Sequence, residues 1–326
     1  MNKSTFKFYT YLLALLVVPF FLLSGCEHVN QPATTQPTPV LAKVALLANA
    51  APLAKVAPLD CSDTGLYQEL MNPPTLAAKD LNINTQLSAK LTDKCVNGKI
   101  IALQSYLDTN AGIDKRAVGP SYILDVDAQL PHPKLAIEFS NKLGDSNKIY
   151  DCGHHGKDVS QCTNLHVHGL HVSPKGSLDP AQVQSDFVFL AISPATQTVK
   201  YDYEIPSSHP PGTHWLHAHL HGSTASQLKQ GMAGAIILKG ALDKTLAKDY
   251  GITGSKDKVM ILQQLSTDAN NTPLCGKASS GENITTSING QCLPIITVMA
   301  GDINRWRFID AGISESINIA VVQVME

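Results

Sequence analysis

The sequence predicts an all-β protein, built as an antiparallel β-sandwich. Short runs of β-forming residues recur along the chain, each bounded by Gly, Pro, Asn or Ser, which is typical of sandwiches. Long stretches with apolar residues at helical spacing are missing from the sequence. The 326 residues are 44% hydrophobic and 16% charged, a composition that indicates one or two globular domains. A formal net charge of −2 without a basic run gives no reason to expect a nucleic-acid partner.

The predicted strands fall into two units. In the first they are residues 121–126, 134–139, 164–171, 187–192, 198–205, 214–219 and 233–238. In the second they are residues 258–263, 295–298, 305–309 and 318–324. Asn-Gly pairs at 97–98 and 289–290 predict turns, and residues 242–249 favour a short helix between the units.

The N-terminus has the features of a bacterial export signal. Lys3 and Lys7 precede a thirteen-residue apolar run, which is too short to span a bilayer comfortably but suits a signal-peptide core. The following Leu-Ser-Gly-Cys resembles a lipobox, in which Cys26 is lipidated. An uncleaved anchor or an ordinary signal peptide is the alternative. We therefore expect an exported protein, lipid-anchored and facing the periplasm or exterior. The outer membrane is favoured because Glu27 is not the aspartate linked to inner-membrane retention.

Composition divides the chain further. Proline, alanine and threonine dominate after Cys26, as in a tether. The second unit has only about seventy residues, too few for a sandwich of about a hundred, so we expect the sequence to stop within a domain. The predicted division is a lipoprotein signal peptide at 1–25, a tether at 26–60, a disulfide-clipped cap at 61–95, a first domain at 96–240, a linker at 241–257 and an incomplete second domain at 258–326.

Histidines in alternation form two groups. The stretch PPGTHWLHAHLHG carries His217, His219 and His221, and NLHVHG carries His166 and His168. Alternate side chains of a strand share a face, so the imidazoles of one HxH unit lie roughly 7 Å apart and can reach one metal ion or two adjacent ions. Two such units predict a metal site between two strands. Imidazole ligands suit copper, zinc, iron or nickel.

Six cysteines remain after the lipobox. They are Cys61, Cys95, Cys152, Cys162, Cys275 and Cys292. An even number in an exported chain indicates disulfides, for which six cysteines allow fifteen connectivities. Pairing of sequence neighbours is the natural prediction, because each pair closes a local loop. The alternative makes one cysteine a thiolate copper ligand. Only Cys152 and Cys162 have histidines close by in the sequence, and both lie in a loop-like insertion.

The motifs resemble a known family. NLHVHGLHVSP, followed by IPSSHPPGTHWLHAHLHGSTASQLKQGMAGAIIL, resembles the N-terminal, plastocyanin-like cupredoxin domain of a bacterial multicopper oxidase of the laccase or copper efflux oxidase kind. The later ING and GDINRWRFIDAG are similar to the opening of that family's second cupredoxin domain. The resemblance runs from about residue 96 to the C-terminus. It implies a cupredoxin-like Greek-key sandwich, with one complete domain and an incomplete second one.

The resemblance also implies copper as the cofactor. By residue-to-residue match His166 is a type 2 copper ligand, while His168, His217 and His219 bind the paired type 3 coppers. In that family the trinuclear site reduces O2 to water, with electrons from a type 1 copper where a phenolic or metal-ion substrate is oxidised. Catalytic residues separate from the metal ligands are not implied.

Neighbouring residues are predicted to have other roles. Trp215 and Gly234 are interpreted as packing positions. His221 is expected near the site or exposed, and His154 and His155 are expected to face solvent, with an adventitious metal site as the lesser alternative.

The sequence departs from the family after His221, its last histidine. The family completes its trinuclear site with four further histidines from a C-terminal domain, which also holds the type 1 copper. An HCH unit does not occur in this sequence, so a second polypeptide or a longer reading frame would have to supply those ligands. Two hypotheses follow: the N-terminal part of a multicopper oxidase, or a non-catalytic periplasmic copper-binding lipoprotein. A zinc lyase of the α-carbonic anhydrase kind is disfavoured by the histidine spacing.

Overall fold

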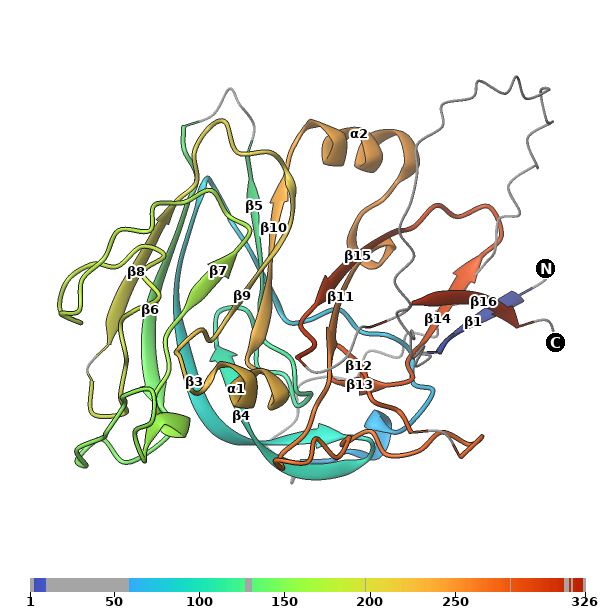
Figure 1. Ribbon diagram of the computed structural model, residues 1–326. Coiled ribbons are helices and arrows are strands. Elements are labelled where there is room, and N and C mark those ends of the chain that lie inside the picture. The colour runs from blue at the N-terminus through green and yellow to red at the C-terminus, as the bar shows by residue number, and fades with distance from the viewer. Residues whose placement is uncertain are drawn as a thin grey trace, which may run out of the picture.

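A computed structural model describes residues 3–9, 59–126, 131–196, 198–281, 283–313, 317 and 319–324 (Figure 1). The apolar run of the predicted signal peptide, the candidate lipidation site Cys26 and the tether up to residue 58 lie outside these residues. Within the described part of the chain, the helices are all too short or too polar to span a bilayer.

Two packed sheets form the first unit. One has the spatial order β2 (Thr75–Ala77), β5 (Ser121–Asp125), β10 (Ala233–Lys239), β9 (Gly212–His217) and β7 (His166–His168). The other has the order β4 (Lys99–Asp108), β3 (Asn82–Val96), β6 (Lys134–Lys142) and β8 (Val199–Glu204). The all-β, cupredoxin-like prediction is confirmed. The sheets are mixed and not wholly antiparallel, because β2–β5, β5–β10 and β3–β6 are parallel pairs.

The core of this unit lies between the two sheets. Strand β6 alternates buried and more exposed residues, so Leu135, Ile137 and Phe139 point inward. They pack in one cluster with Leu216 of β9 and Ile236 of β10. A two-sheet sandwich with a shared apolar interior results.

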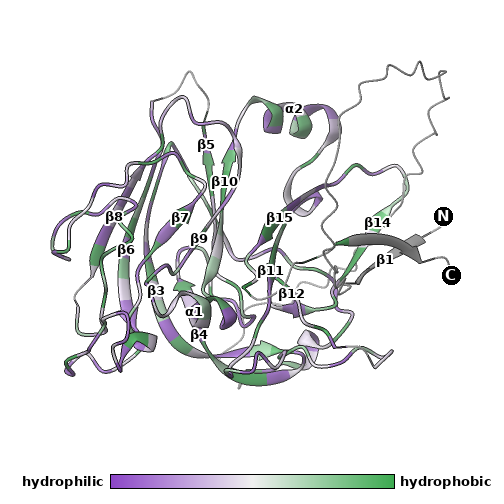
Figure 2. Ribbon diagram, in the orientation of Figure 1, coloured by the Kyte–Doolittle hydropathy of each residue, from purple (hydrophilic) through white to green (hydrophobic). Residues whose placement is uncertain are grey.

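Strand β10 is buried on both faces. Ile236 and Leu238 belong to the sandwich core, while Ala235 and Ile237 pack with Ile261 of the second unit. This explains the nearly continuous hydrophobic colour of β10 in Figure 2. The second unit is therefore joined to the first through an apolar interface.

The second unit contains a four-stranded and a three-stranded sheet. The first has the order β13 (Gln291–Cys292), β12 (Ser287–Ile288), β11 (Asp257–Gln263) and β15 (Arg305–Asp310). The second has the order β14 (Ile295–Met299), β1 (Lys3–Tyr9) and β16 (Ala320–Val324). Strand β1 lies within the stretch predicted as the signal peptide, so its removal would take one strand from this sheet. The helices are α1 (Thr224–Lys229) and α2 (Ala241–Tyr250), with 3₁₀ turns at Ser62–Thr64, Val159–Gln161 and Gly254–Lys256. Helix α2 confirms the predicted short helix.

Both predicted Asn-Gly turns are present. Asn97 and Gly98 have φ values of 48° and 73°, and Asn289 and Gly290 have values of 53° and 72°. Each pair joins two adjacent antiparallel strands, β3 to β4 and β12 to β13. Positive φ at both central residues is the reason for the Asn-Gly sequence.

The structure differs from the predicted elements in several places, and strands β2, β3 and β4 were not predicted. Residues 187–192 form no strand; Ile192 makes only an isolated bridge to Thr163. The strand predicted at 164–171 shrinks to the three residues of β7. The predicted cap boundary at residue 95 falls inside β3, which pairs with β4 and β6, so residues 82–95 belong to the sandwich. The remaining domain boundaries stay predictions.

The six cysteines pair as sequence neighbours. The structure has the disulfides Cys61–Cys95, Cys152–Cys162 and Cys275–Cys292. The alternative in which one of these six is a thiolate ligand is therefore wrong.

Candidate metal centre

Strand register brings the two HxH units together. Strands β7 and β9 are antiparallel neighbours, with His166 opposite His217 and His168 opposite Trp215. Residues directly opposite on adjacent strands lie close to one another. Two motifs about fifty residues apart in the sequence thus share one end of the sheet.

Three imidazoles have the spacing of a metal site. The ligand atoms of His166, His168 and His217 all lie within 4.8 Å of one another. The ring centroid of His166 lies 5.6 Å from that of His168 and 5.1 Å from that of His217. The rings are closer than the roughly 7 Å expected of ideal alternate strand positions. This group could converge on a single cation.

His219 lies beside this group, although β9 ends at His217. Its ring centroid is 4.8 Å from that of His166 and 5.6 Å from that of His217. Its backbone N–H donates to the side-chain oxygen of buried Asn164 at 2.8 Å. The side chain is exposed. All four predicted histidines therefore occupy one location, and their roles as ligands stay a prediction.

A carboxylate that the sequence did not reveal orients His166. Asp186 Oδ1 lies 2.9 Å from His166 Nδ1 and accepts the N–H of Val167 at 3.0 Å. A proton held on Nδ1 leaves the Nε2 lone pair of His166 free for a metal ion. Asp186 follows His166 by twenty residues in a loop, where no fixed spacing indicates such a contact.

His217 is the buried member of the group, with 5% of its surface exposed. Its Nδ1 lies 2.8 Å from the Ala218 carbonyl, to which it donates as the neutral imidazole. Its Nε2 is buried and has no hydrogen-bond partner. Buried polar atoms are almost always satisfied, so an orphaned Nε2 facing two other imidazoles fits a metal ligand.

Burial favours the neutral form of His217 and of His168. Desolvation lowers the pKa of His217 from 6.5 to about 3, with smaller contributions from neighbouring imidazoles, while the hydrogen bond to Ala218 opposes the shift. Desolvation is also the largest cause of the lowered pKa of His168, followed by His166 and His219. Neutral imidazole is the form that binds metal. The donor set, nitrogen only and uncharged, fits copper in both oxidation states.

Trp215 packs between two of the candidate ligands. Its ring stacks on His217 at 4.2 Å between centroids and on His168 at 5.0 Å. The predicted packing role is consistent with these contacts. The indole restricts the orientation of both imidazoles.

A second histidine group lies near the loop that precedes β9. His209 accepts the backbone N–H of His171 on Nε2 at 3.0 Å, and its Nδ1 lies 2.8 Å from the Pro210 carbonyl. Both ring nitrogens of His209 are thereby used. The ring of His214 lies 5.1 Å from that of His209. These contacts give His209 a structural role.

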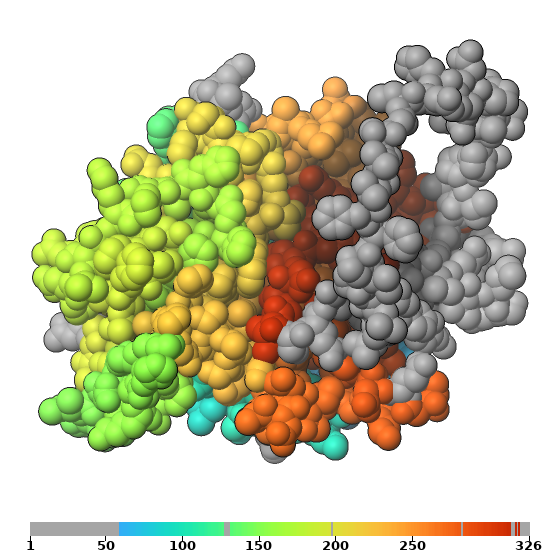
Figure 3. Space-filling model, viewed as in Figure 1, coloured from blue at the N-terminus to red at the C-terminus, as the bar shows by residue number. Residues whose placement is uncertain are grey.

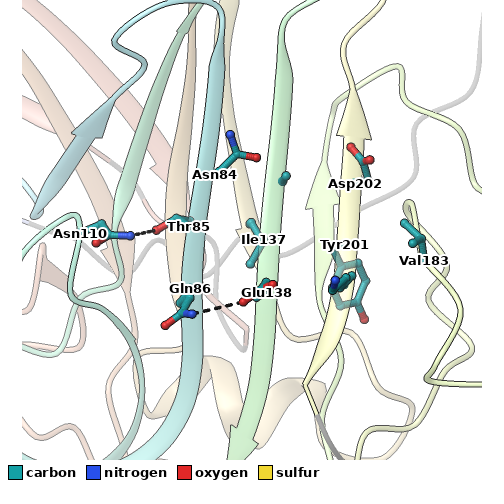
Figure 4. A pocket seen from close by; sticks show the side chains of 11 residues that line it. Asn84, Thr85, Gln86, Asn110, Ile137, Glu138, Val183, Tyr201 and Asp202 are labelled. Atoms are coloured by element: carbon teal, nitrogen blue, oxygen red, sulfur yellow. Dashed lines mark hydrogen bonds between the residues drawn. The ribbon is translucent and has the colours of Figure 1, made fainter.

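A surface hollow of about 600 Å³ lies elsewhere, on the outer face of β3, β6 and β8. Figure 4 shows Gln86 donating to Glu138, and Asn110 donating to Thr85, across this hollow. Its polar groups are therefore partly paired with one another. The hollow holds none of the candidate ligands.

Comparisons with known proteins match the segment of the chain that carries these histidines. The multicopper oxidase family model matches residues 156–242, a segment that contains all four histidines of the cluster. Laccase-4 of Thanatephorus cucumeris is 27% identical over 203 residues, which cover 57% of this chain and 34% of that protein.

Solved structures were compared with the fold of this chain. McoA, a multicopper oxidase from Aquifex aeolicus, aligns with a TM-score of 0.50 and 19% identity over 76% of this chain and 46% of its own. A multicopper oxidase from Campylobacter jejuni has a TM-score of 0.46 and 22% identity over 72% and 42%. The chain spans about a third to a half of the length of these relatives. By its family match over residues 156–242 and by its fold, this chain is similar to the N-terminal part of multicopper oxidases.

Proposed function

We propose that His166, His168, His217 and His219 supply four ligands to a trinuclear copper centre that reduces O2 to water. The main support for this proposal is the convergence of two HxH units on adjacent strands, with the buried Nε2 of His217 left without a hydrogen-bond partner. His166 would hold the type 2 copper, and the other three the type 3 pair. Copper bound there would transfer electrons from a phenolic or metal-ion substrate to O2.

Neighbouring groups orient two of these histidines. Asp186 and the Ala218 carbonyl each engage an Nδ1 atom, which directs the Nε2 atoms of His166 and His217 toward the shared space. Burial holds His217 unprotonated at neutral pH. A cation therefore displaces no proton from this ring when it binds.

The remaining ligands would come from polypeptide outside this sequence. Three ions need more donors than four imidazoles, and the chain covers 46% of the matched Aquifex structure. A C-terminal segment carrying HPxHxHG and HCHxxxH would complete the centre and add the type 1 copper. Translation of the nucleotide sequence beyond Glu326 tests this directly, and their absence in every frame would contradict the oxidase proposal.

A non-catalytic copper-binding role is the second candidate. It is favoured by the clustering of the four imidazoles, which suffice to hold copper without turnover. Copper stoichiometry and oxygen consumption with a phenolic or Cu(I) substrate separate the two. We expect the isolated chain to bind copper and consume no oxygen. Sustained four-electron reduction by this chain alone would overturn that expectation.

A double variant tests the site itself. His217→Ala with His219→Ala should abolish copper binding at the site between β7 and β9, because it removes the whole contribution of one HxH unit. His132→Ala, which removes an exposed histidine of another loop, is the matched control and should bind as the parent does. Equal copper affinity in the double variant and the parent would refute the site.

We also propose that the protein is exported and lipid-anchored through Cys26. The support is the sequence alone: a basic start, a short apolar run and Leu-Ser-Gly-Cys. Labelling of cells with a radioactive fatty acid should mark the parent protein and leave the Cys26→Ser variant unmarked. Labelling of both would contradict lipidation at this residue.

A further inference from the structure

A second imidazole cluster, formed by His154, His155 and His221, lies on the surface. The ring of His154 stacks on that of His221 with 3.7 Å between centroids and 26° between planes. The ring of His155 lies 4.0 Å from that of His154. All three side chains are exposed. None of them belongs to the four candidate ligands of the metal centre.

Backbone packing holds the two segments of this cluster against each other. Gly222, directly after His221, has φ of 98°, and a Cβ added there would lie 2.7 Å from the carbonyl oxygen of His154. Only glycine permits so close an approach at positive φ. In Figure 3 the green loop around residue 150 lies against the gold segment around residue 220. The three imidazoles are thus neighbours because of the fold.

Covalent and polar links hold the loop in this position. The disulfide Cys152–Cys162 closes the loop that carries His154 and His155. The carbonyl of Cys162 accepts hydrogen bonds from Ser223 Oγ at 3.1 Å and from Gln227 Nε2 at 2.9 Å. Lys148 pairs with Asp158 at 2.8 Å within the same loop. Such anchoring lowers the entropic cost of bringing three ligands to one ion.

We propose that His154, His155 and His221 bind a transition-metal ion in addition to the centre between β7 and β9. Three imidazoles from two anchored segments form a nitrogen donor set, for which Cu(II) has the highest affinity among the divalent first-row ions. The stacked rings of His154 and His221 face each other, so one must rotate for both to bind the same ion. Their exposure leaves that rotation free of core packing. This inference extends the proposed function and does not depend on it.

The surroundings of His154 favour the neutral form of its imidazole. Desolvation is the largest cause of its lowered pKa, followed by the charges of His155 and His221. An unprotonated imidazole is available to a metal ion near neutral pH.

The experiment counts Cu(II) ions bound per chain by equilibrium dialysis against copper chloride. The parent should bind one more ion than the variant with His154→Ala, His155→Ala and His221→Ala. The single variant His221→Ala should raise the dissociation constant of that ion by about tenfold or more, since it removes one of the two anchored segments. His132→Ala, another exposed histidine, should change neither number.

Two further variants separate this site from the metal centre. The double variant His217→Ala with His219→Ala should keep the additional ion, whether or not the centre binds copper. Cys152→Ser with Cys162→Ser should weaken its binding severalfold, with circular dichroism confirming the fold. The proposal is overturned if the triple variant binds as many ions as the parent with equal affinity, or if His132→Ala loses as much binding as His221→Ala.

Discussion

At the scale of single residues, burial sets the protonation of His217. Its pKa falls from 6.5 to about 3 on folding, chiefly through desolvation, so the unfolded chain takes up this proton more readily than the folded one. The resulting contribution to stability is complete above pH of about 6.5 and is lost as the pH falls toward about 3. The free energy of unfolding of the metal-free chain, measured with a denaturant at a series of pH values, should show this loss. His217→Gln should show a shallower decline between about pH 7 and about pH 4; parallel curves would contradict the assignment.

We expect Asp186 to influence copper binding through its contact with His166. Asp186→Asn keeps an acceptor oxygen for the N–H of Val167 but removes the charge beside His166 Nδ1. Loss of that charge makes the imidazole a weaker donor, and we expect copper affinity to fall about tenfold. The control is Asp179→Asn, an exposed carboxylate in the same loop. Competition with a chelator measures the copper affinity of both variants. An equal loss of affinity in the two would exclude a specific effect on His166.

The clustering of the four histidines was predictable from the sequence, and the groups that contact their ring nitrogens were not. His166 and His217 are marked by alternation, a property of the local chain that survives in the strands. Asp186 and the Ala218 carbonyl gain their roles only from tertiary contacts. His219 is a different case, because it lies past the end of β9 and is positioned by Asn164.

At the scale of elements, an apolar segment can be buried without pairing as a strand. Residues 187–192 look like a strand because Leu190 and Ile192 are apolar, and both are indeed buried, yet the segment adds no strand to either sheet. Strand β3 is the opposite case, a paired strand that the sequence pattern did not predict. Its inward positions include Thr85 and Ala89, which weaken the hydrophobic alternation that signals a strand.

Strand β10 depends on a glycine where it approaches its neighbours. A Cβ on Gly234 would lie 2.5 Å from the carbonyl oxygen of Pro120 and 3.4 Å from Leu216 Cγ. Because backbone must move to admit it, Gly234→Ala should lower the free energy of unfolding by about 1–3 kcal/mol. Urea denaturation measures the change.

The matched control for this substitution is Gly65→Ala. An added Cβ at Gly65 meets no atom within 4 Å, and φ there is −68°, so the change should stay within about 0.5 kcal/mol. Strand β9 pairs with β10 at this point, with Gly234 opposite Leu216. Copper affinity should therefore fall with Gly234→Ala also. Equal stability of the two variants would show that β10 can shift without cost.

At the scale of the whole molecule, polar contacts accompany the apolar interface between the two units. Arg307 of β15 donates to both carboxylate oxygens of Asp257, at 2.7 and 2.9 Å, and to Asp243 of α2 at 2.7 Å. It also reaches Thr213 Oγ1 of β9 at 3.3 Å. The guanidinium thus connects the second unit to the strand that carries His217. These residues are far apart in sequence, so no local pattern predicts the network.

Arg307 is 4% exposed, and its removal would leave the largely buried carboxylate of Asp257 without its cation and Asp243 with Arg305 alone. Arg307→Ala should therefore lower the free energy of unfolding by about 3–5 kcal/mol. Lys256→Ala removes a partly exposed pair, Lys256–Asp302 at 3.0 Å, and should cost about 0–1 kcal/mol. Urea denaturation at neutral pH compares the two. If Arg307→Ala costs no more than Lys256→Ala, the two units are held together by the apolar contacts of β10 and not by this network.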